Sequence, residues 1–209
     1  MARAKTQPAP GKGGKGALTL ERILAAAAES FGRDGYQNSK MNRVAAMAGV
    51  SRAALYKYFP TKESLLLALH EKIIADTLAH AKAILASDAP ALHVIGDWLR
   101  YNLLDERVRA SVRILTLQDV QALLTLDHEA TAQALKTMKL ALMRVVRRGV
   151  QEGDLDPALN PADTAHMLQA LAFSVNRNNM SDRPVVSLAE ARHVDAFLAA
   201  LADGLRRRR

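Results

Sequence analysis

Two short helical segments joined by a single-glycine turn constrain the fold of this chain more than any other feature. They lie within residues 38–66, and the first segment places Val44, Ala45 and Ala48 on one face at helical spacing. Gly49 follows at once and supplies the tight turn that a change of chain direction requires. The pattern predicts a short helix that packs by its apolar face and ends at this glycine.

The second segment is expected to be a helix with its own cap. Ser51 stands at the N-cap position, where its hydroxyl can accept a hydrogen bond from a free amide of the next turn. The helix from Ser51 to Tyr58 buries Leu55, and Ala53 and Ala54 are small enough to let it lie deep in a major groove. Four side chains are expected to face outward, namely Arg52, Ala53, Tyr56 and Lys57.

The flanking residues carry further start and stop signals. Pro60 ends the second helix, Thr61 can cap the next one, and Glu63 falls in the first turn of that helix, where an acid suits the dipole. Lys40 occupies the N-cap place of the first segment and has no side-chain acceptor. Ser39 could cap instead, with the helix starting one residue earlier.

Residues 18–67 resemble the DNA-binding region of TetR-family regulators. The shared positions are Ala48, Gly49, Val50, Ser51, Leu55, Tyr56, Phe59, Lys62 and Glu63. Three positions depart from the family pattern: Ala53-Ala54 replaces a usual Gly-Thr, Lys40 replaces a common capping Thr, and Tyr58 replaces a frequent His. Beyond this region the resemblance is architectural, and the departures leave the operator sequence open.

The resemblance implies a ligand-responsive transcriptional regulator, most simply a repressor that binds double-stranded operator DNA. Arg43 and Arg52 are the expected base or backbone readers, while Tyr56, Lys57 and Lys62 resemble the phosphate contacts of the family. The full expected DNA-binding set is Lys40, Arg43, Ser51, Arg52, Ala53, Tyr56, Lys57 and Lys62.

The positive charge is unevenly distributed along the chain, which has a formal net charge of +8. Residues 18–62 hold seven basic residues against three acids, whereas residues 63–205 hold 14 basic residues against 18 acids. We therefore expect residues 1–17 to be a disordered basic arm, 18–62 a DNA-binding domain, 63–205 a ligand-binding and dimerisation domain, and 206–209 a basic tail.

Helical periodicity continues through most of the chain, and strand-like alternation is absent from the sequence. We predict an all-α protein of about nine helices, with a three-helix helix-turn-helix domain followed by a helical body. The first helix carries the stripe Leu20, Ile23, Leu24, Ala27, Ala28 and Phe31 and ends at Gly32 and Gly35. Further helices are expected near residues 61–85, 90–103, 106–122, 127–151, 161–179 and 187–205.

Apolar stripes on the last two helices suggest an assembly surface. TetR-like proteins pair these helices across a two-fold axis, so the resemblance implies a homodimer, which would double the length of DNA that is read. The alternative is that both stripes pack within one chain. The interface residues expected are Leu168, Leu171, Val175, Val194, Phe197, Leu198 and Leu201.

The resemblance also implies a cavity for a small-molecule effector among the body helices. Polar side chains on apolar surfaces and adaptable apolar side chains suggest a mostly apolar molecule with few hydrogen-bonding groups. The candidate ligand-binding residues are Trp98, Tyr101, Asn102, Gln118, Met138, His166, Phe173 and Asn176, and Met143, Met167 and Gln169 are further candidates for the cavity wall.

No catalytic or metal-binding constellation is visible in the sequence. The chain has no cysteine, and its six histidines form no paired ligand motif. We therefore expect a cytoplasmic protein that is not an enzyme, needs no cofactor or metal, and is not inserted in a membrane. Two alternatives remain, a nucleic-acid-coating protein without sequence preference and an all-α enzyme with a coincidental motif.

Overall fold

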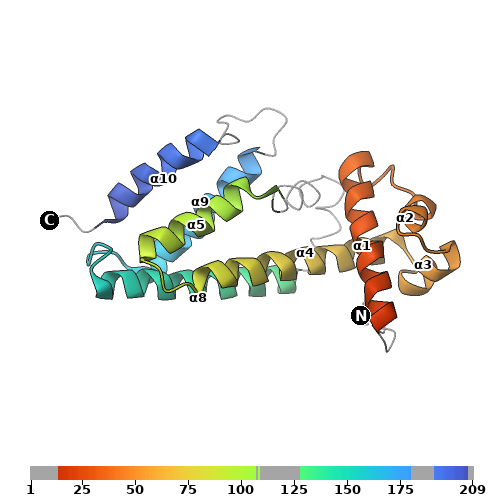
Figure 1. The fold of residues 1–209 in the computed structure, drawn as a ribbon, viewed down its shortest axis with the longest axis horizontal. Coiled ribbons are helices and arrows are strands. Elements are labelled where there is room, and N and C mark those ends of the chain that lie inside the picture. Colours follow the sequence, from red (N-terminus) through yellow and green to blue (C-terminus); the bar gives the residue numbers. More distant parts are fainter. Residues whose placement is uncertain (1–13, 107, 109–127, 180–190, 207–209) are drawn as a thin grey trace. The chain divides into compact units, whose positions relative to one another are not determined.

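The computed structural model describes residues 14–106, 108, 128–179 and 191–206. Within these residues the protein is all-α, as predicted, with eight helices and no strand (Figure 1). The helices are α1 (Gly14–Asp34), α2 (Met41–Met47), α3 (Arg52–Tyr58), α4 (Lys62–Leu85), α5 (Ala91–Leu104), α8 (His128–Glu152), α9 (Pro161–Asn179) and α10 (Ala191–Leu205).

The described chain divides into two compact units, each with its own hydrophobic core. The first contains residues 14–73, and the second contains residues 74–106, 108, 128–179 and 191–206. The division falls inside α4, which begins in the first unit and ends in the second. The domain boundary proposed from the sequence lies at the start of this helix instead of within it.

The core of the first unit is built on one face of α1. Ile23, Ala27 and Phe31 of this helix are fully buried, and Val44 of α2 and Leu55 of α3 join the same cluster. The partly buried Leu20 and Ala28 pack against it, so the whole stripe predicted for the first helix lies on the core side. Burial of these side chains places both short helices against α1.

The second unit is organised around α5 and α8. Trp98 and Leu99 of α5 and Leu142 of α8 are almost completely buried, and Leu168 of α9 and Val194 of α10 complete the same cluster. Because all four helices contribute fully buried side chains, this unit has a continuous core without help from another chain.

Polar contacts fix the connections around that core. The Asp154 carboxylate accepts a hydrogen bond from the amide of Ala91 at 3.0 Å, which caps the start of α5. Arg148 of α8 donates to the carbonyls of Ser87 (2.9 Å) and Ala89 (2.7 Å) and so holds the segment before α5.

The expected ends of most helices differ little from those in the structure, but α1 is a correction. It begins at Gly14, inside the segment that we expected to be disordered, and it continues through Gly32 to Asp34. The Thr19 hydroxyl donates to the Lys15 carbonyl in this extra turn. Extending an existing helix by one turn requires no new nucleation, so two glycines do not prevent it.

Some predicted segments lie outside the described residues. These are residues 1–13 of the arm, almost all of the helix expected at 106–122, the start of the helix expected at 187–205, and the arginines after Arg206. None of the described helices is long and apolar enough to cross a membrane.

We predict that Gly149→Ala destabilises the protein by about 1–3 kcal/mol, although alanine favours a helix. A Cβ on Gly149 of α8 would lie 2.5 Å from the Ala91 Cβ and 2.8 Å from Leu155. Gly96→Ala in α5 is the matched control, because its new Cβ would meet only Arg100, at 3.8 Å. It should gain about 0.5–1 kcal/mol. Urea unfolding measures both, and a Gly149→Ala variant at least as stable as the parent would contradict this packing.

Candidate nucleic-acid interface

The turn between α2 and α3 has the geometry that the sequence predicts. Gly49 adopts a positive φ of 62°, the left-handed conformation that favours glycine. Its amide donates to the Ala46 carbonyl at 3.1 Å, and the amide of Val50 donates to the Ala45 carbonyl at 3.0 Å. This pair of bonds is a Schellman motif, which satisfies the last carbonyls of α2 and reverses the chain direction.

Helix α3 starts at the predicted cap and presents the predicted face. The Ser51 hydroxyl accepts a hydrogen bond from the Ala54 amide at 3.1 Å. Leu55 is fully buried, and Phe59 just after the helix is 1% exposed, so one side of α3 is fixed to the core. The four residues expected to face outward do so, and they are Arg52, Ala53, Tyr56 and Lys57.

The next helix is also capped as expected. The Thr61 hydroxyl accepts a hydrogen bond from the Ser64 amide, and the Ser64 hydroxyl accepts one from the Thr61 amide. Hydrogen bonds from its own amide and from Thr61 lower the pKa of Glu63, which lies in the first turn of α4. The bonds of Thr61 and Ser64 satisfy main-chain amides at the start of α4.

At the start of α2 the alternative cap is wrong. The helix begins at Met41 after Lys40, whose side chain makes no capping bond. Ser39 is instead buried, and its hydroxyl lies 2.9 Å from the Ser30 carbonyl and 2.8 Å from the Gly35 carbonyl, which share its single proton. The Ser39 hydroxyl is therefore already engaged in hydrogen bonding. Its partner Ser30 lies on α1 and becomes a neighbour only on folding, so a local sequence pattern does not reveal the contact.

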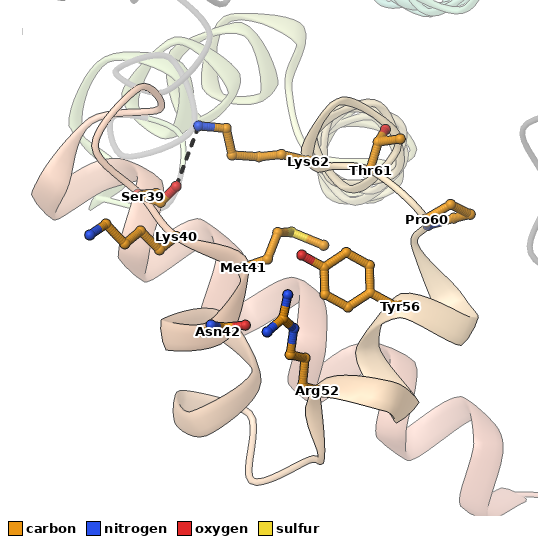
Figure 2. Close-up of a pocket in the computed structure, with 9 residues that line it drawn as sticks. All are labelled: Ser39, Lys40, Met41, Asn42, Arg52, Tyr56, Pro60, Thr61 and Lys62. Carbon is orange, nitrogen blue, oxygen red and sulfur yellow. Dashed lines mark hydrogen bonds between the residues drawn. The ribbon is translucent and has the colours of Figure 1, made fainter.

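An open groove of about 470 Å³ separates the start of α2 from α3 and the start of α4 (Figure 2). Arg52 and Tyr56 reach across it from α3 toward Met41 and Asn42 at the start of α2. The Arg52 guanidinium lies over the Tyr56 ring, 5.4 Å from its centre. The groove is lined by Ser39, Lys40, Met41, Asn42, Arg52, Tyr56, Pro60, Thr61 and Lys62.

The basic residues of this unit are not equally available to a ligand. Lys40, Arg52 and Lys57 are exposed and form no ion pair with any described residue. Arg43 is exposed but lies 3.5 Å from the Asp34 carboxylate. A hydrogen bond and the charge of Arg33 lower the pKa of Asp34, which therefore stays ionised beside Arg43.

Lys62 differs from the expectation that it contacts phosphate. Its ammonium points into the unit and donates to the main-chain carbonyls of Tyr36 (2.8 Å), Gln37 (3.1 Å) and Ser39 (3.3 Å). It also lies 4.4 Å from the centre of the Tyr36 ring. Lys62 lines the groove, but its ammonium group forms hydrogen bonds with main-chain carbonyls of the same unit.

Arg22 of α1 is a contributor that the sequence analysis missed. Its guanidinium donates to the carbonyls of Ala48 and Gly49, at the end of α2. A Cβ on Gly49 would lie 2.6 Å from the Arg22 Nη2. Glycine is therefore favoured here by the backbone conformation, and a Cβ would in addition displace the end of the Arg22 side chain.

The candidate effector residues are scattered over the second unit. Trp98 and Met138 are buried, and Asn102 donates to the Trp98 carbonyl at 2.7 Å. The Tyr101 ring stacks on His80, with ring centres 4.8 Å apart. His166 is exposed and Phe173 is 61% exposed, so the structure does not bring these two to the buried group. Gln118 and the side chain of Asn176 lie outside the described residues.

The remaining wall candidates of the effector cavity are divided in the same way. Met143 packs partly buried against the core of the second unit, and Gln169 donates to the Leu135 carbonyl at 2.9 Å. Met167 is instead 64% exposed on α9. It therefore faces away from any cavity within that core.

The expected dimer residues divide into two groups. Leu168, Val194 and Leu198 are buried in the core of one chain, so their side chains are not exposed on its surface. They lie on the inner side of α9 and α10, which the sequence stripes could not distinguish from an outer side. The others are only half-buried, and they are Leu171, Val175, Phe197 and Leu201.

The turn, the capped second helix and its exposed face define a helix-turn-helix protein. The family model for bacterial regulatory proteins of the TetR family matches residues 23–69. RutR of Escherichia coli is 37% identical over 81 residues, which make up 39% of this chain and 38% of RutR. UidR of Escherichia coli is 25% identical over 191 residues, which make up 90% of this chain and 92% of UidR.

Solved structures extend the similarity in fold. The reduced form of Escherichia coli NemR superposes with a TM-score of 0.67 at 16% identity, covering 91% of this chain and 100% of NemR. These findings show that residues 23–69 are similar to the DNA-binding region of TetR-family regulators and that the fold of the chain is similar to that of solved TetR-family regulators.

The pH dependence of protein stability should report the ionisation of Tyr36, whose side chain is only 4% exposed. Burial, with the nearby Glu63 carboxylate, raises the pKa of Tyr36 from 10.0 to about 12. Between these values the unfolded chain has lost the phenolic proton and the folded chain retains it. The free energy of unfolding therefore falls as pH rises through this window, by an amount on the order of 2 kcal/mol.

The Tyr36→Phe variant lacks the ionisable group and should not show this part of the alkaline loss. Urea unfolding of both proteins across the alkaline range measures the difference. Parallel stability curves for the parent and the variant would show that Tyr36 ionises freely in the folded chain.

Proposed function

We propose that this protein is a ligand-responsive transcriptional repressor that binds an inverted-repeat operator as a homodimer in the cytoplasm. The observation that carries the proposal is the outer face of α3, where Arg52, Tyr56 and Lys57 flank the small Ala53. A helix with small residues at its centre can enter the major groove while its long side chains reach bases and phosphates.

The proposed division of work among the DNA-binding residues follows their position. Arg52 lies on α3 and is the proposed reader of base edges or the adjacent backbone, and Tyr56 beside it is a proposed phosphate contact. Lys40 and Lys57 are exposed cations at the rim and are proposed to neutralise phosphates. Arg43 is proposed as a backbone contact, since its partner Asp34 already occupies one side of its guanidinium.

The proposed dimer uses the outer side of α9. Met167 is 64% exposed and Phe173 is 61% exposed, and the exposed Ala170 lies between them on the same side of the helix. Large apolar side chains grouped in this way are typical of a surface that another protein covers. A second copy of this chain is the proposed occupant, because an inverted repeat requires two recognition helices.

The proposed effector is a small, mostly apolar molecule that binds next to Trp98 in the second unit. The indole Nε1 of Trp98 is buried and has no hydrogen-bond partner among the described residues. A buried donor of this kind favours a ligand with a single acceptor group. The effector changes DNA binding only if it binds the two states of the protein with different affinity, and the effect is then reciprocal.

Selection of bound duplexes from random DNA tests the proposed function. We expect an enriched inverted repeat whose half-site centres lie roughly 34–36 Å apart, or further apart if two dimers share the site. Enrichment of no palindrome, with binding that depends steeply on salt alone, would favour a protein that coats nucleic acid without sequence preference.

The proposed interface predicts that Phe173→Glu yields folded monomer. The side chain is exposed in one chain, so the substitution should leave folding intact. In the dimer it would bury two unpaired charges, which weakens association by at least about 100-fold. Sedimentation measures the assembly, and DNA binding should fall with it.

Leu18→Glu is the matched control for that sedimentation experiment, because Leu18 is 62% exposed on α1 in the first unit. It should remain dimeric. A Phe173→Glu variant that also remains dimeric would place the interface on another surface.

A further inference from the structure

Helix α2 of the first unit depends on its surroundings for its position. It has seven residues and no side-chain cap at its start. A helix of this length has no independent stability in water, so its position depends on what holds it. Its inner face is fixed by burial of Met41, Val44 and Ala45. Because Met41 is its first residue, burial anchors the helix itself, and the connection before Met41 is left to be held by other groups.

Lys62 holds the chain that enters α2. The carbonyls of Tyr36, Gln37 and Ser39 lie 2.8, 3.1 and 3.3 Å from its ammonium nitrogen. These residues form the connection between α1 and α2, and Figure 2 shows the ammonium directed at Ser39. An ammonium has three protons, so three carbonyls account for all of its donors.

The surroundings of Lys62 favour this inward position over solvent. The side chain is half-buried, and its charge lies 4.4 Å from the centre of the Tyr36 ring, which attracts cations. Tyr36 is itself packed edge-on against Phe31, with ring centres 5.4 Å apart. To reach a phosphate, the ammonium would have to break three hydrogen bonds and leave the ring.

Lysines of the same surface differ from Lys62 in this respect. Lys40 and Lys57 are exposed, and no described residue forms a hydrogen bond or ion pair with their ammonium groups. These two are free to exchange water and counterions for phosphate without an internal loss. Lys40 and Lys57 can therefore bind phosphate, whereas the ammonium of Lys62 is held by contacts within the protein.

We propose that Lys62 is a positioning residue that fixes the entrance to α2, and that it does not bind phosphate. It holds the α1–α2 connection to the first turn of α4 and so sets the position of the first turn of α2, with Asn42, at the rim of the groove. The inference rests on the proposed function only for the choice of DNA as the ligand.

The salt dependence of DNA binding distinguishes the two roles of a lysine. Each lost phosphate contact lowers the slope of log affinity against log salt concentration by about 0.9, or about twice that in a dimer. Random-sequence duplex DNA is the probe, because counterion release does not depend on sequence. Lys62→Met should weaken binding by about 5- to 30-fold and leave the slope unchanged. Lys57→Met and Lys40→Met are the matched controls and should lower the slope.

Two outcomes of the salt titration would overturn the proposal. A slope that falls in Lys62→Met as it does in Lys57→Met would make Lys62 a phosphate contact. An affinity and a slope that both equal those of the parent would show that Lys62 positions nothing.

A second measurement uses the unmodified protein, so it remains decisive if Lys62→Met does not fold. Nitrogen-15 NMR of the lysine ammonium groups should show slow proton exchange at Lys62 without DNA and no change when duplex is added. A Lys62 signal that becomes protected only with DNA would overturn the proposal. If the parent binds no duplex at all, the proposed function fails, while the spectrum of the DNA-free protein still tests the contacts of Lys62.

Discussion

Helices of seven residues do not persist alone in water, and the proposed DNA-reading surface consists of two of them. Everything else in the first unit serves to hold α2 and α3 at a fixed angle. Leu55 and Val44 anchor them to α1 by burial, and Gly49 with its two main-chain bonds sets the turn between them. Burial of apolar side chains stabilises the packing of α2 and α3, and the turn at Gly49 sets the direction in which the chain leaves α2.

Polar side chains hold the ends of α2 and α3, in addition to the burial of their apolar faces. Ser51 caps α3, Arg22 binds the carbonyls at the end of α2, and Lys62 binds the carbonyls before its start. A net count of charges in this region treats all basic residues alike, yet Arg22 and Lys62 are directed at main-chain oxygens. Fewer basic groups than the sequence suggests are therefore free of internal contacts, and the exposed Lys57 is one of those proposed to bind DNA.

The sequence predicted the local features and missed the contacts between distant segments. Ser51, Gly49 and Thr61 act on residues within a few positions of themselves, so spacing alone revealed their roles. The internal contacts of Lys62 and Ser39 were not predicted, because their partners include Gln37 and Ser30, which become neighbours only after folding. The stripes of α9 and α10 were recognised as apolar, but periodicity does not tell which side faces the chain's own core.

Helix α4 sets the limits on how an effector in the second unit can alter DNA binding. Leu65, Leu66 and Leu69 belong to the first core, and Ala81 and Leu85 belong to the second. Helix α4 is, under the proposed function, the continuous segment through which repacking around Ala81 and Leu85 would bear on its first turn, where Lys62 contacts the α1–α2 connection. Under the proposed function, a ligand near Trp98 would need to favour one position of this helix over another, because equal binding to both positions shifts no population.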